Sequence, residues 1–380
     1  GLNADGAISG AVSATIDGSI QLTGGSNGDS YVQIGVGGSG SDGVKGGDVT
    51  VSGTGATLTG GTGGGSNVLI GNGGGTAQGT ADNASGSITG NTSLTTTAGA
   101  VSMSSSVAAF DNFVQVGAGG RGSVGGGNSI NSATSVSTTG GGLTMNAANA
   151  AYVQIGAGGH QVDVASLTGN VLVNAGGAIT LSGGSGQNRY AQIGNGGMGS
   201  DATKSGNTTV TGTSLLMTTG SGAGSNVLIG LGGGMDQTNS DFSNGALTGN
   251  VLVTTTTDGV TMNSASAGVQ AFAQIGNGGL VSDGNLSGTT TVNSAGAVVL
   301  TAGAQSNTYT RIGAGGAGND GAITNTATTV TGTNLSMTAG SNSSAFTQIG
   351  AGGGATGGGN LALGNITGDV SVTMTGAISI

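Results

Sequence analysis

Cysteine, proline, tryptophan and glutamate are all absent from the 380 residues of this chain. Without cysteine the chain cannot form a disulfide framework, a thiol nucleophile or a zinc site built on cysteines. A single histidine, His160, and no glutamate leave very little acid–base machinery for catalysis. Five basic residues and a net charge of −10 cannot neutralise a nucleic-acid backbone. We therefore expect no enzyme activity, no catalytic residues, no cofactor and no nucleic-acid partner.

Long hydrophobic runs are missing as well. No stretch approaches the ~18 apolar residues of a membrane-spanning helix, so we expect no membrane span. Disordered chains combine low hydrophobicity with high charge, whereas here 34% of the residues are hydrophobic and only 5% are charged. The composition therefore favours a folded chain with an apolar interior.

Glycine is abundant, at 89 residues, and it marks a repeat. A five-residue signature occurs nine times, typified by Tyr-Val-Gln-Ile-Gly, and each copy is followed by one residue and then Gly-Gly. The copies are residues 31–35, 67–71, 113–117, 152–156, 190–194, 226–230, 272–276, 309–313 and 346–350. The signature glycines lie 36 to 46 residues apart, and a block of four units is itself duplicated, since residues 35 and 194 are separated by the same interval as residues 71 and 230. Internal repetition of this kind indicates a solenoid.

Two further apolar positions recur along the chain. The first ladder comprises Val51, Leu94, Val136, Val173, Val210, Val253, Val292, Val330 and Val372. The second comprises Leu22, Leu58, Met103, Met145, Leu181, Met217, Met262, Leu300, Met337 and Ile380. The intervals from the first ladder to the second and from the second to the signature are nearly constant, so one loop after the signature absorbs the variation in length.

This spacing predicts an all-β fold, a parallel β-helix or β-solenoid of about nine to ten coils, each of 36–46 residues with three main strands. Equivalent residues of successive coils then stack at the ~4.8 Å spacing of neighbouring strands, and apolar side chains form interior columns. Glycine at this density disfavours helix, where each costs about 1 kcal/mol relative to Ala. We treat residues 1–380 as a single continuous repeat domain and interpret it as a stretch of a longer array.

The residues also resemble a known family. Residues 169–181 (Gly-Asn-Val-Leu-Val-Asn-Ala-Gly-Gly-Ala-Ile-Thr-Leu) and 190–197 (Tyr-Ala-Gln-Ile-Gly-Asn-Gly-Gly) are similar to the repeats of filamentous-haemagglutinin-like bacterial surface proteins. The resemblance covers the chain and implies a right-handed β-helical shaft, an extracellular or cell-surface location, and a role in adhesion or biofilm matrix. It also implies that the partners are neighbouring shafts, or host or matrix glycans.

One candidate contact surface follows from the signature. Its first position holds seven of the nine aromatic residues, and its third position is usually Gln. By strand alternation both face away from the Val and Ile columns. We expect a ladder that is buried either by the variable loop or by a neighbouring shaft. It comprises Tyr31, Phe113, Tyr152, Tyr190, Phe272, Tyr309, Phe346, Gln33, Gln115, Gln154, Gln192, Gln274 and Gln348.

Aspartates after the Gly-Gly pair raise the alternative of calcium binding. Residues 37–45 match the calcium nonapeptide Gly-Gly-x-Gly-x-Asp-x-apolar-x. The equivalent residues elsewhere are Asp163, Asp201, Asp283 and Asp320. Because these segments lie one repeat apart, they cannot form consecutive turns of a calcium β-roll, and we favour turn aspartates that bond their own backbone. A cation that bridges Asp163 with Asp201, or Asp283 with Asp320, stays open, and no metal ligand is assigned.

Other site chemistries find less support. The basic residues Lys45, Arg121, Arg189, Lys204 and Arg311 are interpreted as scattered among different coils and repeat positions, without the carboxylate cluster of a polysaccharide-active β-helix. An ice-binding face would need a regular Thr-x-Thr rank, which the first strand does not keep. We therefore expect a structural shaft or fibre-forming segment, with a carbohydrate-binding or polysaccharide-active protein and a calcium-binding repeat protein as alternatives.

Overall fold

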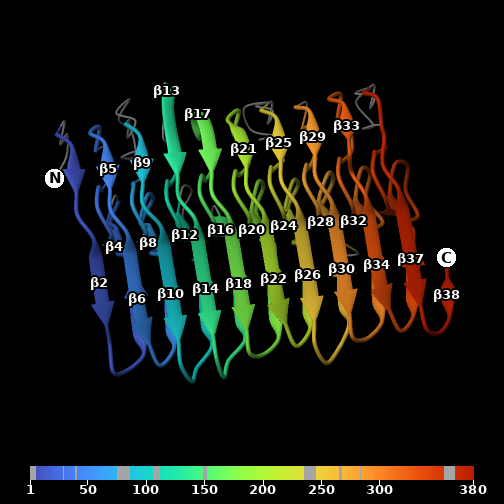
Figure 1. The fold of residues 1–380 in the computed structure, drawn as a ribbon, viewed down its shortest axis with the longest axis horizontal. Helices are drawn as coiled ribbons and strands as arrows, with labels where there is room; N and C mark the ends of the chain where they lie inside the picture. Colours follow the sequence, from blue (N-terminus) through green and yellow to red (C-terminus); the bar gives the residue numbers. More distant parts are fainter. Residues whose placement is uncertain are drawn as a thin grey trace.

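The computed structural model describes residues 6–28, 30–38, 41–74, 86–105, 112–122, 124–148, 152–234, 245–264, 268–282, 284–354 and 364–380. Their regular structure consists of β-strands that pair in parallel into four long sheets. Each coil of the chain visits the four sheets in turn, and successive coils stack side by side along the long axis (Figure 1). The expected all-β parallel solenoid is confirmed.

Two sheets, named here sheet B and sheet C, contain ten strands each. Sheet B consists of β2 (Val12–Thr15), β6 (Val49–Gly53), β10 (Thr92–Thr96), β14 (Thr134–Thr138), β18 (Val171–Ala175), β22 (Thr208–Gly212), β26 (Val251–Thr255), β30 (Thr290–Ser294), β34 (Thr328–Gly332) and β37 (Val370–Met374). Sheet C consists of β3 (Ile20–Thr23), β7 (Ala56–Thr59), β11 (Val101–Ser104), β15 (Leu143–Asn146), β19 (Ile179–Ser182), β23 (Leu215–Thr218), β27 (Val260–Asn263), β31 (Val298–Thr301), β35 (Leu335–Thr338) and β38 (Ile378–Ser379). These sheets hold the first and second apolar ladders.

The signature forms sheet D, which has nine strands. They are β4 (Val32–Ile34), β8 (Val68–Ile70), β12 (Phe113–Val116), β16 (Tyr152–Ile155), β20 (Tyr190–Ile193), β24 (Val227–Ile229), β28 (Phe272–Ile275), β32 (Tyr309–Ile312) and β36 (Phe346–Ile349). Equivalent residues pair directly, as Ile155 does with Ile193. Eight turns of the chain therefore connect the first strand of sheet D to the last.

The expectation of three strands per coil is corrected by sheet A, a fourth sheet of nine strands within the segment that follows the signature. Its strands are β1 (Ile8–Ser9), β5 (Lys45–Gly46), β9 (Ile88–Thr89), β13 (Val124–Asn131), β17 (Asp163–Thr168), β21 (Thr203–Ser205), β25 (Leu247–Thr248), β29 (Leu286–Ser287) and β33 (Ile323–Thr324). Most contain only two or three residues, which is too short for a visible alternation of apolar and polar side chains.

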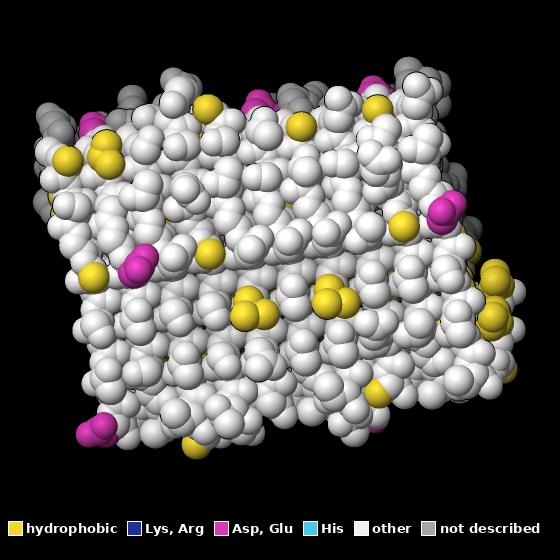
Figure 2. Space-filling view, in the orientation of Figure 1, with side chains coloured by type: hydrophobic (Ala, Val, Ile, Leu, Met, Phe, Trp, Pro, Cys, Tyr) yellow, Lys and Arg dark blue, Asp and Glu magenta, His cyan; other side chains and the backbone are white. Residues whose placement is uncertain are grey.

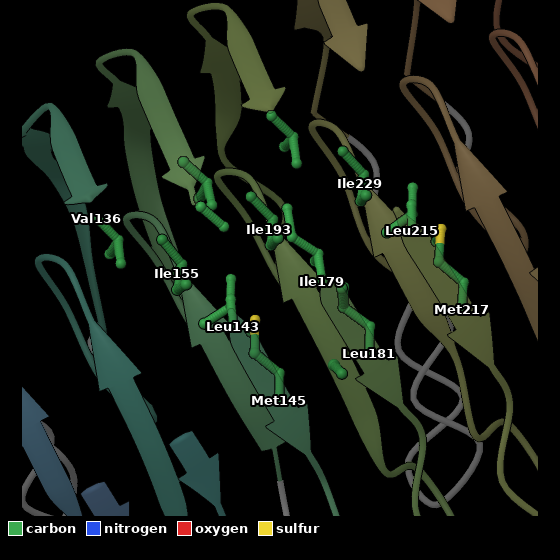
Figure 3. Packing of buried hydrophobic residues seen from close by; sticks show 14 of the residues in the cluster. Val136, Leu143, Met145, Ile155, Ile179, Leu181, Ile193, Leu215, Met217 and Ile229 are labelled. Carbon is green, nitrogen blue, oxygen red and sulfur yellow. The ribbon is translucent and has the colours of Figure 1, made fainter. Parts of the chain in front are cut away.

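The main core lies between sheets B, C and D. Each sheet contributes alternate side chains to one continuous cluster, and Figure 3 shows Val136, Met145 and Ile155 entering it from the three sheets. In β16, Val153 and Ile155 belong to this cluster, as the strand alternation predicts. The same columns continue through the coils, so each coil buries its apolar side chains against the coil before it and the coil after it.

A second set of buried clusters lies beside the main core. Sheet A residues such as Leu167 and Leu247 pack against the residue between the signature glycine and Gly-Gly, for example Ala157 or Leu231. The outer face of sheet D is also buried, in two clusters that contain its aromatic residues. Sheet D is thus an internal sheet, covered on both faces. Within the described residues, no helix is long and apolar enough to cross a membrane.

Candidate functional site

The predicted aromatic ladder lies inside the protein. Tyr152, Phe272 and Tyr309 have no exposed surface, while Phe113 and Tyr190 are 1% and 3% exposed. They pack with apolar residues from the segment after Gly-Gly, among them Met198 and Leu280. At the ends of the column Tyr31 is 41% exposed and Phe346 is half-buried. Of the two ways of burying the ladder, the structure shows cover by the chain itself.

The rings form two stacks of three. In the first, Phe113, Tyr152 and Tyr190 lie in successive coils with ring centroids 5.2 and 5.0 Å apart and interplanar angles of 6° and 3°. The second repeats this arrangement with centroid distances of 5.0 and 4.9 Å between Phe272, Tyr309 and Phe346. The parallel register of sheet D produces these distances, because equivalent Cα atoms in neighbouring strands are spaced by ~4.8 Å.

The glutamine column binds the backbone of the neighbouring segment. Gln154 Nε2 donates to the carbonyl oxygens of Ala157 at 3.2 Å, Gly194 at 3.2 Å and Gly196 at 3.0 Å. Gln115 and Gln192 make the equivalent set of bonds in their own coils. Each amide therefore ties its own coil to the next one. Gln115, Gln154, Gln192 and Gln274 are buried, and Gln33 and Gln348 are half-buried.

The close approach of a ring and of the next coil explains two of the glycines around the signature. A β-carbon on Gly159 would lie 2.5 Å from the Tyr152 hydroxyl oxygen, and its φ of +145° is one that other residues rarely adopt. The signature glycine Gly156 has a φ of +137°, and a β-carbon there would lie 2.3 Å from the carbonyl oxygen of Gly194. Glycine is needed at both positions because the backbone of one coil approaches the ring and the next coil so closely.

Two coils replace the ring with asparagine. Asn67 and Asn226 directly precede β8 and β24, and their side-chain oxygens accept hydrogen bonds from the backbone N–H of Phe113 and Phe272, at 3.0 and 3.2 Å. Asn226 separates the two ring stacks, and it is the counterpart of Asn67 in the second copy of the duplicated block. Where the ring is missing, the asparagine side chain therefore accepts the hydrogen bond from the backbone N–H of the next coil.

The aspartates after Gly-Gly face a charged neighbour that the sequence did not reveal. The side chain of Lys204 is completely buried, and its Nζ donates to the carbonyl oxygens of Ser200 at 2.6 Å and Ala202 at 2.9 Å. Burial lowers the pKa of this ammonium to about 7, against the attraction of Asp201 and Asp163. Burial and the neighbouring Asp201 carboxylate raise the pKa of Asp163. Lys204 thus interacts electrostatically with Asp201 and Asp163, and the bridging cation between these two aspartates stays a hypothesis.

The two lysines lie in different coils, as expected, but the interpretation that they occupy different repeat positions is wrong. Lys45 and Lys204 occupy the same position of sheet A, and Lys204 pairs directly with Leu167 and Leu247. Each lysine follows an aspartate at the same short interval, and the two are counterparts in the duplicated block, which was the available signal. Lys45 is 1% exposed, its Nζ donates to the Gly43 carbonyl oxygen at 2.8 Å, and burial lowers its pKa.

The other aspartates after Gly-Gly differ in how far they are buried. In the described part of the chain, no group of three or more His, Cys, Asp or Glu side chains is placed to hold a metal ion. Asp42 is half-buried, whereas Asp320 is exposed, and Asp283 lies outside the described residues. The alternative bridge between Asp283 and Asp320 is therefore left as a hypothesis.

Arg311 and Arg121 make unrelated contacts in different parts of the chain. Arg311 replaces the signature glutamine in β32 and is fully buried, with its Nη2 donating to the carbonyl oxygens of Ala314 and Gly350. Its Nε and Nη1 have no hydrogen-bond partner, and burial lowers its pKa to about 10. Arg121 Nε donates to His160 Nδ1 at 3.1 Å across neighbouring coils. Each of these contacts links neighbouring segments of the chain.

Sheet B carries a nearly regular outward column of hydroxyl side chains. Its first outward column is Ser or Thr in eight of ten strands, interrupted by Leu172 and Leu252: Ser13, Thr50, Ser93, Ser135, Leu172, Thr209, Leu252, Thr291, Thr329 and Ser371. Figure 2 shows this side of the molecule, where most of the surface is backbone or side chains that are neither hydrophobic nor charged, with scattered Asp side chains and no visible Lys or Arg among the described residues. A shallow groove of about 320 Å³ lies on sheet C beside Leu216, Thr261 and Val299.

Comparison of the chain with protein-family models, with curated proteins and with solved structures finds no match. The chain is therefore a β-solenoid repeat protein, and no family is assigned to it. The geometry offers stacked rings, amide ladders, buried lysines and a column of hydroxyl side chains on sheet B, all of which repeat along the axis.

Proposed function

We propose that this chain is a structural shaft, a fibre-forming segment of an extracellular bacterial surface or matrix protein. The observation that supports this best is the continuity of the four sheets, which extend from coil to coil through the described chain. Each inner coil pairs in parallel with the coil before it and the coil after it. A rod of this kind carries load along its axis through parallel ladders of backbone hydrogen bonds.

Cohesion in such a shaft comes from its columns. Each fully buried Val, Ile or Leu side chain contributes about 1.5–3 kcal/mol, and every inner coil places several in the main core. The ring stacks and glutamine bonds on the other face of sheet D link the same coils a second time. Because sheet D is packed on both of its faces, we expect the rod to resist bending and shear between coils.

The biological setting rests on the resemblance of the repeats to filamentous-haemagglutinin-like proteins. On that basis the shaft belongs to a secreted adhesin or biofilm-matrix protein at the bacterial cell surface, and its role requires no catalysis, cofactor or metal. Its partners are neighbouring shafts or matrix glycans.

Electron microscopy of the native material, with gold-labelled antibody raised against this chain, tests both parts of the proposal. We expect label along thin straight fibres outside intact, unpermeabilised cells. Label confined to permeabilised cells would contradict the location. Label on isolated round particles would contradict the shaft.

A second candidate function is binding of a neutral glycan, favoured by the uncharged hydroxyl columns of sheet B. Hydroxyl side chains can donate to and accept from sugar hydroxyls. Sedimentation with insoluble polysaccharides tests this, by comparing the wild-type chain with a Thr209→Glu, Thr329→Glu double variant of sheet B. Glycan binding requires co-sedimentation that the double variant loses and that Thr180→Glu on sheet C retains.

A further inference from the structure

The two asparagine coils contain matching small cavities, a buried one at Asn226 and one at Asn67 that lies at the end of the column beside the half-exposed Tyr31. One is lined by Tyr190, Gln192, Met198, Asn226, Leu228, Gly233, Gly234 and Phe272. The other is lined by Tyr31, Val32, Gln33, Asn67, Leu69, Gly74 and Phe113. Six lining residues of the first cavity have a counterpart in the second, at the equivalent positions of the other copy of the block. The duplication of the block has thus kept both the cavity and its lining.

The cavities lie where a ring is missing from the stack. Consecutive rings are about 5 Å apart in each stack, so Tyr190 and Phe272, two coils apart, leave the space of one ring between them. Asn226 fills only part of this space because its side chain is smaller than a phenyl ring. The free space left at each site is about 10 Å³, which on this measure corresponds to about one water molecule.

The polar groups at the Asn226 cavity are incompletely bonded. Asn226 is 2% exposed, and its Nδ2 has no hydrogen-bond partner, while its Oδ1 accepts from the Phe272 backbone. In two other coils the glutamine Oε1 accepts a hydrogen bond from the tyrosine hydroxyl of the next coil, as Gln115 does from Tyr152 and Gln274 from Tyr309. Gln192 is followed by Asn226 and has no such hydroxyl above it. The cavity therefore combines an amide donor with an amide acceptor.

We propose that the Asn226 cavity is a binding site for one water molecule, which accepts a hydrogen bond from Asn226 Nδ2 and donates one to Gln192 Oε1, and that the Asn67 cavity binds a water at the equivalent place. The walls exclude the other small ligands. A cation would face the N–H of Asn226, and an anion would face the electron-rich rings of Tyr190 and Phe272. An organic molecule is too large for the free space. A neutral ligand that both donates and accepts fits the lining.

A buried amide without a partner destabilises the folded chain, and a bound water removes that cost. Buried waters of this kind make two to four hydrogen bonds and form part of the structure. The proposed sites therefore replace the missing ring and the missing tyrosine hydroxyl with a single molecule. They do not depend on the function of the protein as a shaft.

A high-resolution crystal structure of the wild-type chain tests the proposal directly. We expect one water peak within hydrogen-bond distance of Asn226 Nδ2 and Gln192 Oε1, and a second at Asn67 and Gln33. The absence of a peak, or density for a larger ligand, would overturn it.

Nuclear magnetic resonance gives an independent readout in solution. The Asn226 side-chain amide should show a cross-peak to a long-lived water, and Asn226→Leu should lose it while the Asn67 cross-peak persists. The reciprocal Asn67→Leu variant is the matched control. If Asn226→Leu does not fold, the wild-type spectrum alone tests the proposal. The absence of the cross-peak between the Asn226 amide and water would show that the site is dry and would refute the proposal.

Discussion

The ring of Tyr152 lies parallel to that of Tyr190, with centroids 5.0 Å apart and an interplanar angle of 3°, in the interior of a single chain. This relationship shows that the ladder stabilises the rod itself. Its central rings have almost no exposed surface with which to contact a neighbouring shaft.

The first prediction concerns this ring. Replacement of a buried ring by a small residue typically costs about 3–5 kcal/mol, so Tyr152→Ser should lower the free energy of unfolding by about that amount. Tyr31→Ser is the matched control, because Tyr31 occupies the same column and is 41% exposed. Urea denaturation of both variants measures the difference. Equal losses for the two variants would show that burial in the stack adds nothing.

Sheets B, C and D were predictable because their apolar residues recur at nearly fixed intervals. Val136, Met145 and Ile155 of one coil are each followed, about one repeat later, by a similar residue, and all three lie in the main core. The outward orientation of Tyr152 relative to that core also followed from alternation within the strand.

Sheet A and the cover of the rings were not predictable on the same grounds. Strands such as Ile8–Ser9 are too short to alternate, and the apolar column of sheet A contains Lys45 and Lys204. Met198 packs on the rings from a segment whose length and residues vary between coils. Because these contacts are irregular, the burial of the rings produces no periodic pattern in the sequence.

The second prediction concerns an unpartnered hydroxyl in the core. Thr134 is 1% exposed, its Oγ1 has no hydrogen-bond partner, and Val171 occupies the same position one coil later. Thr134→Val should raise the free energy of unfolding by about 1 kcal/mol, because a buried hydroxyl without a partner is costly. Thr138→Val on the same strand is the control. Thr138 Oγ1 bonds the Gly141 carbonyl oxygen, so that variant should lose stability. A loss for Thr134→Val would contradict the prediction.

The third prediction is a pH dependence from Lys204. The folded chain releases the Lys204 proton near pH 7, whereas the unfolded chain keeps it up to about pH 10.5. The unfolded state therefore binds more protons in this window, and stability should rise as the pH increases from 7 toward 10. Lys45 acts in the same direction because its pKa is also lowered. Above pH 10 the raised pKa of the buried Tyr152 opposes the trend.

Urea denaturation at several pH values between 7 and 9.5 measures this dependence. Lys204→Met should flatten the rise, because it removes the titrating group from an otherwise apolar column. Lys45→Met is the matched control and should leave the Lys204 contribution in place. An unchanged slope in Lys204→Met would refute the assignment.

The fourth prediction is that folding needs no calcium. The apolar columns run through coils with and without an aspartate after Gly-Gly, and Lys204 lies beside Asp163 and Asp201. Thermal unfolding in a chelator and in excess calcium should therefore give closely similar midpoints. A large loss of stability in the chelator would instead support the calcium-binding alternative.

The last prediction tests the independence of the coils by deletion of residues 157–194. Gly156 would then be joined to Asn195, and because Ile155 pairs in register with Ile193, the new connection repeats the old one. Neighbouring repeats interact chiefly with each other, so the shortened chain should stay folded and lose about 4.8 Å of length, one strand spacing. Circular dichroism and small-angle X-ray scattering measure the two effects.

Deletion of residues 157–175 alone is the control. It removes β17 and β18 but keeps β19 and β20, which leaves gaps in sheets A and B, and we expect a marked loss of cooperativity on unfolding. If both deletions unfold the chain alike, then the coils do not act as interchangeable units.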